Sequence, residues 1–363
     1  MGKLRKRIAI VGPVRSGGGV SSVANTVLDT QVIQKDYDVA LFNTSMYEDA
    51  SSLGNFIFFM RSVAAYAGSL AAGRIDLVHV HASYGRSFFR KAVFVLLSGA
   101  AGIKTVLHIH ASRFREYFLR CRGLKKSLIG FILKRCDAVV LLSKNFEDGL
   151  RKEFLLRNTV VIRNPVPFAL DQIAVDPGRR SATKVTILFL GFLVKSKGIH
   201  DLVEIARRLD HGAAPHRIVV CGKGDEGPFL EKVVRDERLT NLEYFGWAST
   251  PEKRDLLSKS GIFILPSYHE GMPVAILEAL SYGLPIVSTK VGAIPELVIE
   301  GENGYLLEPG DIDGLVGKVT ALISDPEKRA AFGARSRTIA ESFSRESIAL
   351  AWKTLYGEIL SNP

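Results

Sequence analysis

The stretch PSYHEGMPVAILEALSYGLPIVS, Pro266–Ser288, is the most informative part of the chain. It predicts the end of a strand, a short loop that contains Glu270, a helix that begins near Pro273, and a new strand. Proline suits the first turn of a helix, where no backbone N–H is needed, and apolar residues follow it at helical spacing. Glu278 lies eight positions after Glu270, which on a helix is about 12 Å at a rise of 1.5 Å per residue. The two carboxylates are therefore too far apart to share a proton and are suited to bind opposite ends of one ligand.

The composition is that of a globular protein. The 363 residues are enough for two domains with separate cores, and 47% hydrophobic with 23% charged residues is ordinary. The cysteines, Cys121, Cys136 and Cys221, are odd in number, so we expect free thiols in a reducing cytoplasm. The apolar run near the start, RIAIVG, is too short for a signal peptide. An arginine interrupts the apolar stretch at 56–73, so no membrane span is expected there.

Strand and helix patterns alternate twice along the chain. Residues 1–166 contain five short apolar strand patterns with helical segments between them, and 184–344 repeat this order. The alternation predicts an α/β fold with parallel sheets and helices on both faces. Between the two halves, 167–183 contain proline, glycine and paired arginines with little periodicity, which is typical of a linker. A final helix is expected at 345–360.

The basic excess of the chain belongs to its first half. Residues 1–170 contain 25 Lys and Arg against 11 Asp and Glu, while the net charge of the whole chain is +11. Within 112–135, aromatic and aliphatic residues alternate with eight basic ones: Arg113, Arg115, Arg120, Arg122, Lys125, Lys126, Lys134 and Arg135. Such a stretch is typical of a helix at an anionic membrane surface, and also of a solvated helix whose apolar side packs on a sheet. The aromatic residues form no stacking platform, so nucleic acid is not expected as a partner.

A glycine-rich loop, GPVRSGGGVSS at 12–22, follows the first expected strand. The run Gly17–Gly19 permits positive φ and a close approach of the backbone to a ligand, and the next helix, expected at 20–29, directs its first N–H groups at the same loop. The loop suits an anion or a sugar, or serves only as a tight turn. It contains neither GxxxxGK[ST] nor a clean GxGxxG, so a P-loop or a nicotinamide site is not indicated.

Two expected strands end in the histidine pairs His79/His81 and His108/His110. We expect the members of each pair to face opposite sides of the sheet, so that one per strand points at any given site. No carboxylate is placed to complete a metal site, so no metal is expected. Ligands of open α/β sheets lie beyond the carboxyl ends of the strands, which favours His110 as a site residue.

The Glu-x7-Glu pattern resembles the donor-binding signature of the GT4 family of retaining glycosyltransferases, whose GT-B fold has two Rossmann-like domains with parallel sheets facing a central cleft. The triple glycine is similar to the GGV segment of that family, and HIHAS to its His-Gly element, with Ala111 in place of glycine. GFLVKSKG resembles the Gly-Arg-Leu-x3-Lys-Gly element, with Phe192 in place of arginine. VGAIPE resembles Gly-Gly-x-x-Glu, with Ala293 replacing a glycine, and VIRNPVP resembles the junction between the domains.

This resemblance implies two domains with different roles, joined by a linker. Residues 1–166 would form the acceptor-side domain, 167–183 a linker, and 184–344 the donor domain. The C-terminal helix in 345–363 would pack back on the first domain.

The resemblance also implies roles for single residues. Lys197 would hold the donor diphosphate, Glu270 and His110 would contact the transferred sugar, and Glu278 would bind the ribose diol. Phe192 removes one of two expected cations, and Lys195, on the same side of an extended loop as Lys197, is the candidate replacement. The other expected donor-binding residues are Gly18, Gly19, Gly222, Gly224, Trp247, Gly271, Met272, Pro273 and Val274.

The function implied is a retaining hexosyltransferase that uses a UDP-sugar, or alternatively GDP-mannose, and a glycan or lipid-linked acceptor in cell-surface polysaccharide or glycolipid synthesis. The resemblance implies no metal or other cofactor, with the nucleotide-diphosphate sugar as co-substrate. The protein would act in the cytoplasm, with 112–135 as a contact to the inner face of the membrane. Two alternatives stay open. One is a GT-B epimerase or phosphorylase, and the other is a non-catalytic nucleotide-sugar-binding subunit.

Overall fold

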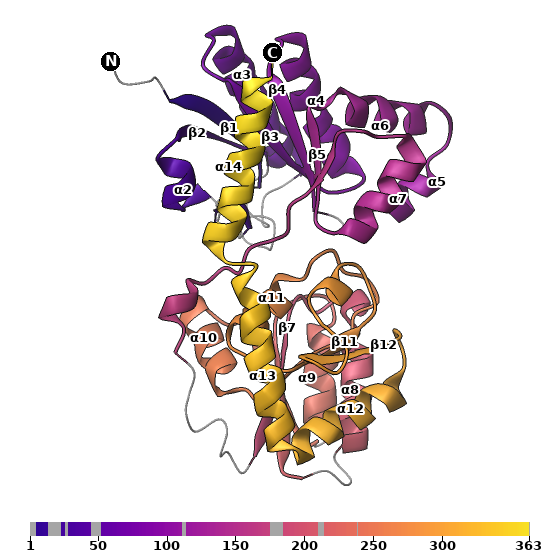
Figure 1. Ribbon diagram of the computed structural model, residues 1–363. Coiled ribbons are helices and arrows are strands. Elements are labelled where there is room, and N and C mark those ends of the chain that lie inside the picture. Colours follow the sequence, from indigo (N-terminus) through magenta and orange to yellow (C-terminus); the bar gives the residue numbers. More distant parts are fainter. Residues whose placement is uncertain are drawn as a thin grey trace. The chain divides into compact units, whose positions relative to one another are not determined.

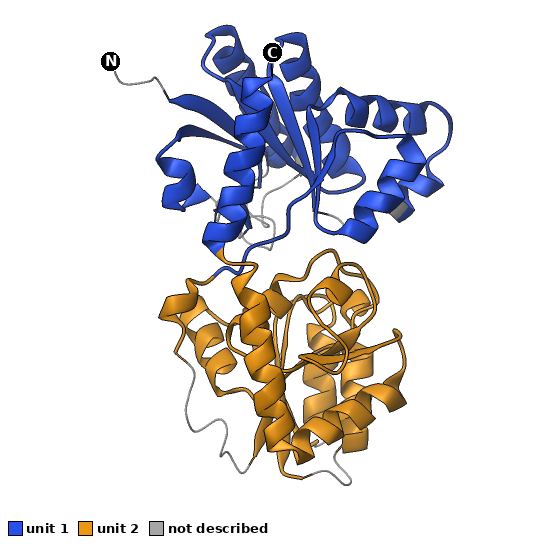
Figure 2. Ribbon diagram, in the orientation of Figure 1, with its two compact units in different colours: residues 1–167, 345–363 blue, residues 168–344 orange. Residues whose placement is uncertain are grey.

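The computed structural model describes residues 5–13, 23–25, 28–44, 52–110, 114–174, 184–209, 214–237 and 239–362. The chain divides into two compact units (Figure 1, Figure 2). Unit 1 comprises Met1–Pro167 and Arg345–Pro363, and unit 2 comprises Phe168–Ser344. Each unit contains one six-stranded sheet.

The sheet of unit 1 is made of short apolar strands. They are β1 Lys6–Gly12, β2 Tyr37–Asn43, β3 Leu77–Ala82, β4 Lys104–Ile109, β5 Ala138–Leu141 and β6 Thr159–Val161. All pair in parallel, in the order β2-β1-β3-β4-β5-β6. Every residue of β3 is buried, as expected for a strand covered on both faces. The strand order reverses between β1 and β3.

Helices cover both faces of this sheet. They are α2 Gln31–Gln34, α3 Ser52–Ala71, α4 Arg86–Ala100, α5 Phe114–Arg120, α6 Gly123–Arg135, α7 Lys144–Phe154 and α14 Arg345–Ser361. One hydrophobic core lies between the sheet and α3–α7, and a second lies between the sheet, α2 and α14. The last helix, α14, therefore packs on the sheet of unit 1 (Figure 1). Its residues Trp352 and Tyr356 are buried in the second core.

Unit 2 repeats the architecture with a second parallel sheet. Its strands are β7 Val185–Leu190, β8 His216–Cys221, β9 Leu242–Gly246, β10 Ile262–Leu265, β11 Ile286–Thr289 and β12 Gly304–Leu307. Their order is β12-β11-β10-β7-β8-β9. The chain builds one half of the sheet from β7 to β9 and then crosses to β10, so the order reverses between β7 and β10.

The helices of unit 2 are α8 Ile199–Leu209, α9 Gly227–Asp236, α10 Thr250–Lys259, α11 Val274–Ser281, α12 Ile312–Ser324 and α13 Pro326–Glu341. Local sequence defines where several of them begin. Asp311 and Asp325 accept hydrogen bonds from backbone N–H groups in the first turns of α12 and α13. Ser249 and Glu252 form a capping box at the start of α10.

The predicted α/β fold with parallel sheets and helices on both faces is confirmed. The helix expected from Pro273 begins at Val274, with Pro273 as its N-cap. All three cysteines are free and buried. Within the part of the chain that the structure describes, no helix has the length and hydropathy needed to cross a bilayer. The triple-glycine loop lies outside the described residues.

Candidate functional site

Lys197 and Glu270 meet at the carboxyl ends of the two central strands of unit 2. Lys197 ends a 3-10 turn, Lys195–Lys197, that follows β7, and Glu270 lies in the loop after β10. Since the strand order reverses between β7 and β10, these two loops flank the edge where open α/β sheets bind ligands. The Nζ atom of Lys197 lies 2.5 Å from Oε1 of Glu270, and Ser267 Oγ donates to the same oxygen at 2.9 Å. A cation and a hydrogen-bond acceptor are thus held together at this edge.

Glycines allow the loops around this pair to pack closely. A Cβ on Gly198, whose φ is +71°, would lie 2.1 Å from the carbonyl oxygen of Pro266. On the other side, a Cβ on Gly292, whose φ is +58°, would lie 2.0 Å from the carbonyl oxygen of Glu270. The N–H of Ala293 donates to the carbonyl oxygen of Gly271 at 2.7 Å. The backbone at Glu270 is therefore held from both sides.

Gly222 and Gly224 follow β8 and pack against the loop after β7. A Cβ on Gly222 would lie 1.9 Å from the carbonyl oxygen of Gly191, and one on Gly224 would lie 2.4 Å from that of Leu193. Contacts within unit 2 therefore account for both glycines. Their approach to a nucleotide stays a prediction.

Glu278 lies in α11 and forms an ion pair with Lys253 of α10. Burial raises the pKa of the Glu278 carboxyl, and the attraction of Lys253 lowers it again in part. A ribose diol at this position would share the carboxylate with the ammonium group of Lys253. The residues from Gly271 to Pro273 end the loop that carries Glu270, and α11 begins at Val274. The first N–H groups of a helix lack partners within it and carry partial positive charge, so they suit an anion.

Trp247, in the loop after β9, lies beside Phe192 from the loop after β7 and Lys223 from the loop after β8. These three residues are called the exposed aromatic group. The ring centroid of Trp247 is 6.0 Å from that of Phe192, and Lys223 Nζ lies 5.1 Å from the Trp247 centroid. Both rings are more than one-third exposed. The group lies at the carboxyl edge of the sheet, where a nucleobase could stack on it.

The expected extended loop around Lys195 is wrong. The residues from Lys195 to Lys197 form a 3-10 turn, in which positions two apart point about 120° away from each other. Lys195 and Lys197 therefore do not share one side of an extended segment. The use of Lys195 as a replacement for the missing arginine stays a prediction.

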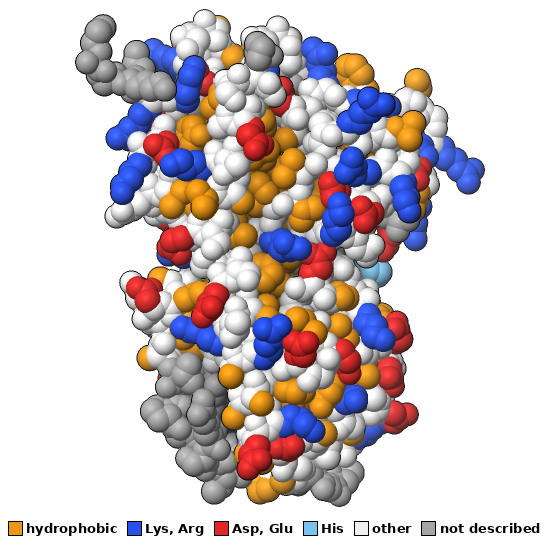
Figure 3. All heavy atoms as spheres, in the orientation of Figure 1, with side chains coloured by type: hydrophobic (Ala, Val, Ile, Leu, Met, Phe, Trp, Pro, Cys, Tyr) orange, Lys and Arg blue, Asp and Glu red, His pale blue; other side chains and the backbone are white. Residues whose placement is uncertain are grey.

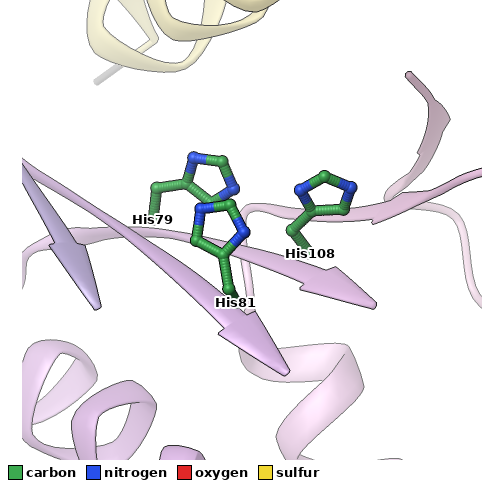
Figure 4. Close-up of side chains that lie close together, drawn as sticks. All are labelled: His79, His81 and His108. Atoms are coloured by element: carbon green, nitrogen blue, oxygen red, sulfur yellow. The ribbon is translucent and has the colours of Figure 1, made fainter. Parts of the chain in front are cut away.

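The four histidines of unit 1 lie on one face of neighbouring strands. His79 and His81 stack at 4.2 Å between ring centroids, whereas the rings of His108 and His110 lie 3.9 Å apart and are tilted by 41° (Figure 4 shows three of the four rings). The expectation that each pair divides between the two faces is wrong, because residues two apart in a strand point the same way. His81 Nδ1 and His110 Nε2 share a hydrogen bond of 2.8 Å. Burial lowers the pKa of all four imidazoles, that of His81 to about 3, so they are neutral at pH 7.

Several expected positions could not be placed, and some neighbours of the site had no sequence signal. Gly18, Gly19 and Ala111 lie outside the described residues. Nothing in the sequence indicated that Lys253 pairs with Glu278, since the two are on different helices. Ser267 could have been found, because it precedes Glu270 by three positions in the same short loop.

Both units match known families, and the whole chain matches known folds. Residues 174–339 match "Glycosyl transferases group 1", and 39–165 match "Glycosyl transferase 4-like domain". Sucrose-phosphate synthase from Thermosynechococcus elongatus has a TM-score of 0.78 at 19% identity, over 99% of this chain and 100% of that chain. Anabaena Alr3699/HepE, solved in complex with UDP, has a TM-score of 0.77 at 18% identity, over 97% of this chain and 100% of that chain.

Glycogen synthase of Mycobacterium tuberculosis is 27% identical over 231 residues, which is 62% of this chain and 55% of the relative. The chain thus spans little more than half of that relative's length. Its two six-stranded parallel sheets and its structural neighbours define a GT-B fold. The chain belongs to the group 1 glycosyltransferases, of the GT4 type.

Proposed function

We propose that this protein transfers a hexose from a nucleotide-diphosphate sugar to a hydroxyl group of a glycan or lipid-linked acceptor, with retention of the anomeric configuration. The observation that carries the proposal is the pair of Lys197 and Glu270 at the reversal of strand order in unit 2. It offers a cation for the diphosphate and an acceptor for sugar hydroxyls. Membership of the group 1 glycosyltransferases supports the class of reaction.

The chemistry follows from where charge develops. Breaking the bond between sugar and phosphate leaves negative charge on the diphosphate and positive, oxocarbenium-like charge on the sugar ring. Lys197 and the N–H groups at the start of α11 stabilise the first of these charges. Glu270 accepts hydrogen bonds from the sugar hydroxyls. The departing phosphate takes the proton of the acceptor hydroxyl on the same face of the sugar, so no carboxylate is needed as a covalent nucleophile.

The remaining predicted residues bind parts of the donor or the sugar. Glu278 accepts from the ribose diol, and Trp247 flanks the base on the exposed aromatic group. His110, kept neutral by burial, can donate or accept one hydrogen bond to the transferred sugar. We favour a uracil base over guanine, because the similar protein HepE was solved with UDP. Lys197 and helix N–H groups neutralise the diphosphate, so the reaction needs no metal.

A single donor series tests both the substrate class and the mechanism. UDP-glucose, UDP-galactose, ADP-glucose and GDP-mannose are added to the protein, and thermal unfolding is followed. At a ligand concentration 100-fold above Kd, we expect about 2.7 kcal/mol of stabilisation from the cognate donor. The product made with that donor should keep its anomeric configuration in NMR spectra, and transfer should continue in EDTA.

The possible outcomes separate the alternatives. An inverted linkage would overturn the mechanism, and complete loss of transfer in EDTA would overturn its independence of metal. Tight donor binding with neither hydrolysis nor transfer would favour a non-catalytic subunit, as the absence of the arginine at Phe192 suggests. Donor turnover without an acceptor would favour an epimerase.

The basic stretch forms α5 and α6, and it both packs on the core and leaves an apolar face exposed. Phe118 and Ile132 are buried in the core. Leu124, Leu128 and Phe131 recur at helical spacing on α6 and are 92%, 42% and 53% exposed. Basic side chains lie next to apolar ones over this part of unit 1 (Figure 3). We propose that this face binds the anionic cytoplasmic surface of a membrane and brings the enzyme to a lipid-linked acceptor used in cell-surface polysaccharide or glycolipid synthesis.

Replacing Leu124 and Phe131 by glutamate is expected to weaken binding to phosphatidylglycerol vesicles by at least about tenfold, because burying one such side chain contributes about 1.5–3 kcal/mol. Vesicle flotation measures the bound fraction. The matched control is Leu350→Glu, which changes a 56% exposed leucine on α14, the helix that covers the opposite face of the sheet. Equal flotation of the wild type and the double variant would contradict membrane binding through α6.

A further inference from the structure

The arrangement of β3 and β4 gives unit 1 a cluster of imidazoles on one face of its sheet. His79 and His81 follow the His-x-His pattern on β3, and the Cα of His108 on β4 is the register partner of His81. Two histidines from one strand and a third from its neighbour therefore point the same way (Figure 4). We propose that His79, His81 and His108 bind one divalent transition-metal ion, with Zn²⁺ as the best match.

The distances fit such a site after a small adjustment. One ring nitrogen from each of the three histidines lies within 4.8 Å of the others. Tetrahedral Zn²⁺ with Zn–N bonds of about 2.0–2.1 Å separates its ligand nitrogens by about 3.3 Å. The rings would need to converge by about 1–1.5 Å to reach this separation.

The cluster leaves polar atoms in the core without partners. His79 Nε2 and both ring nitrogens of His108 are buried and make no hydrogen bond. Each such atom costs about 1–3 kcal/mol of stability. A metal ion would accept a lone pair from each of the two rings, and so would remove part of this cost. The observation itself points to a ligand between the rings.

Hydrogen bonds to neighbouring residues determine which ring nitrogen of His79 and His81 is available to a metal ion. His79 Nδ1 is bonded to the hydroxyl of Tyr356 at 2.7 Å, and His81 Nδ1 to His110 Nε2 at 2.8 Å. With Nδ1 as the donor in both bonds, Nε2 of His79 and of His81 carries the lone pair that a metal needs. Outer hydrogen bonds of this kind orient metal-bound histidines and increase their basicity.

The type of ligand in the cluster restricts which metal ions it can bind. The group found among the described residues consists of imidazoles alone, which favour zinc and its neighbours in the first transition series over Mg²⁺ or Ca²⁺. The charge of Lys91, which lowers the pKa of His81, opposes a bound cation and weakens the site. The three histidines, with Ile10, Leu28 and Trp352, line one small pocket where a water molecule could be the fourth ligand. Such an ion would join β3, β4 and, through Tyr356, α14, and it would take no part in the donor chemistry of unit 2.

The test measures metal content and unfolding, not transfer. Untagged protein is produced in zinc-supplemented medium, freed of loose metal by gel filtration, and analysed by mass spectrometry of the elements. We expect one Zn²⁺ per chain, and an absorption spectrum of tetrahedral Co²⁺ after exchange. His108→Leu should lose the metal, and the control His200→Leu, on α8 of unit 2, should keep it.

Stability distinguishes a lost ligand from a lost fold. His108→Leu removes two unpartnered buried nitrogens, so the metal-free variant should unfold at the same temperature as the metal-free wild type, or higher. Micromolar Zn²⁺ should raise the unfolding temperature of the wild type and leave that of the variant unchanged. A wild type that holds no metal and shows no shift with Zn²⁺, or a variant that binds as well as the wild type, would overturn the proposal.

Discussion

Replacing Lys197 by alanine is expected to lower kcat/KM for sugar transfer by about 10²–10³-fold, the loss typical when one group that stabilises the developing anion is removed. The ammonium group of Lys197 lies beside Glu270 at the reversal of strand order, where the diphosphate of the donor is proposed to bind. Its attraction grows as the bond to the sugar breaks, because negative charge then accumulates on the leaving group. The fall should therefore appear in kcat as well as in kcat/KM. Initial rates over a range of donor concentrations measure both.

Two further variants separate this effect from damage to the fold. Lys197→Ala leaves the buried carboxylate of Glu270 without its cation, so thermal unfolding must confirm that the variant is folded. Lys197→Arg keeps the charge and should retain more activity than the alanine variant. Lys259→Ala breaks an exposed pair with Asp255 on α10 and should leave the rate unchanged. Full activity of a folded Lys197→Ala protein would show that the diphosphate is held elsewhere.

The sequence predicted the architecture well because both sheets depend on local patterns. Short apolar strands alternate with amphipathic helices such as Ile199–Leu209, and the parallel sheets that result are buried on both faces. Each member of the Lys197 and Glu270 pair could also be selected from its motif. Their contact could not, because it joins residues 73 positions apart and depends on β7 and β10 being neighbours in the sheet.

The structure differs from the predictions at the histidine pairs and at Lys195, and it adds a contact of Lys253. The opposite-face prediction for the histidine pairs is wrong, because the strand period of two places residues such as His79 and His81 on the same face. The extended loop expected at Lys195 to Lys197 is instead a 3-10 turn that leads through Gly198 into α8. No sequence pattern indicated the role of Lys253, because its contact with Glu278 depends on how α10 and α11 pack. Sequence patterns thus predicted elements and motifs, whereas contacts across elements, such as that of Lys253 with Glu278, depend on the folded structure.

Replacing Gly292 by alanine is expected to destabilise unit 2 by about 2–5 kcal/mol, the sum of a left-handed backbone conformation and an overpacked contact. Its φ is +58°, and the added Cβ would lie 2.0 Å from the carbonyl oxygen of Glu270 and 2.8 Å from that of Gly271. These atoms are backbone, so they can move away only if the loop itself shifts. The same shift would displace the Glu270 carboxylate from Lys197 and weaken donor binding.

The matched control is Gly301→Ala, which shares the positive φ, +77°, but has no atom within 4 Å of the added Cβ. Gly301→Ala should lower the stability of unit 2 by about 1–2 kcal/mol, which is the cost of the left-handed backbone conformation alone. Hydrogen exchange read on peptides of residues 262–298, with unit 1 peptides as an internal reference, measures the opening of this region in each variant. If the two alanine variants open equally easily and bind donor equally well, the loop at Glu270 accommodates the added methyl group without cost, and the prediction is wrong. A larger loss at Gly292 in both measurements would instead show that the loop after β11 holds Glu270 in place, and that the geometry of the Lys197 pair depends on backbone packing as much as on charge.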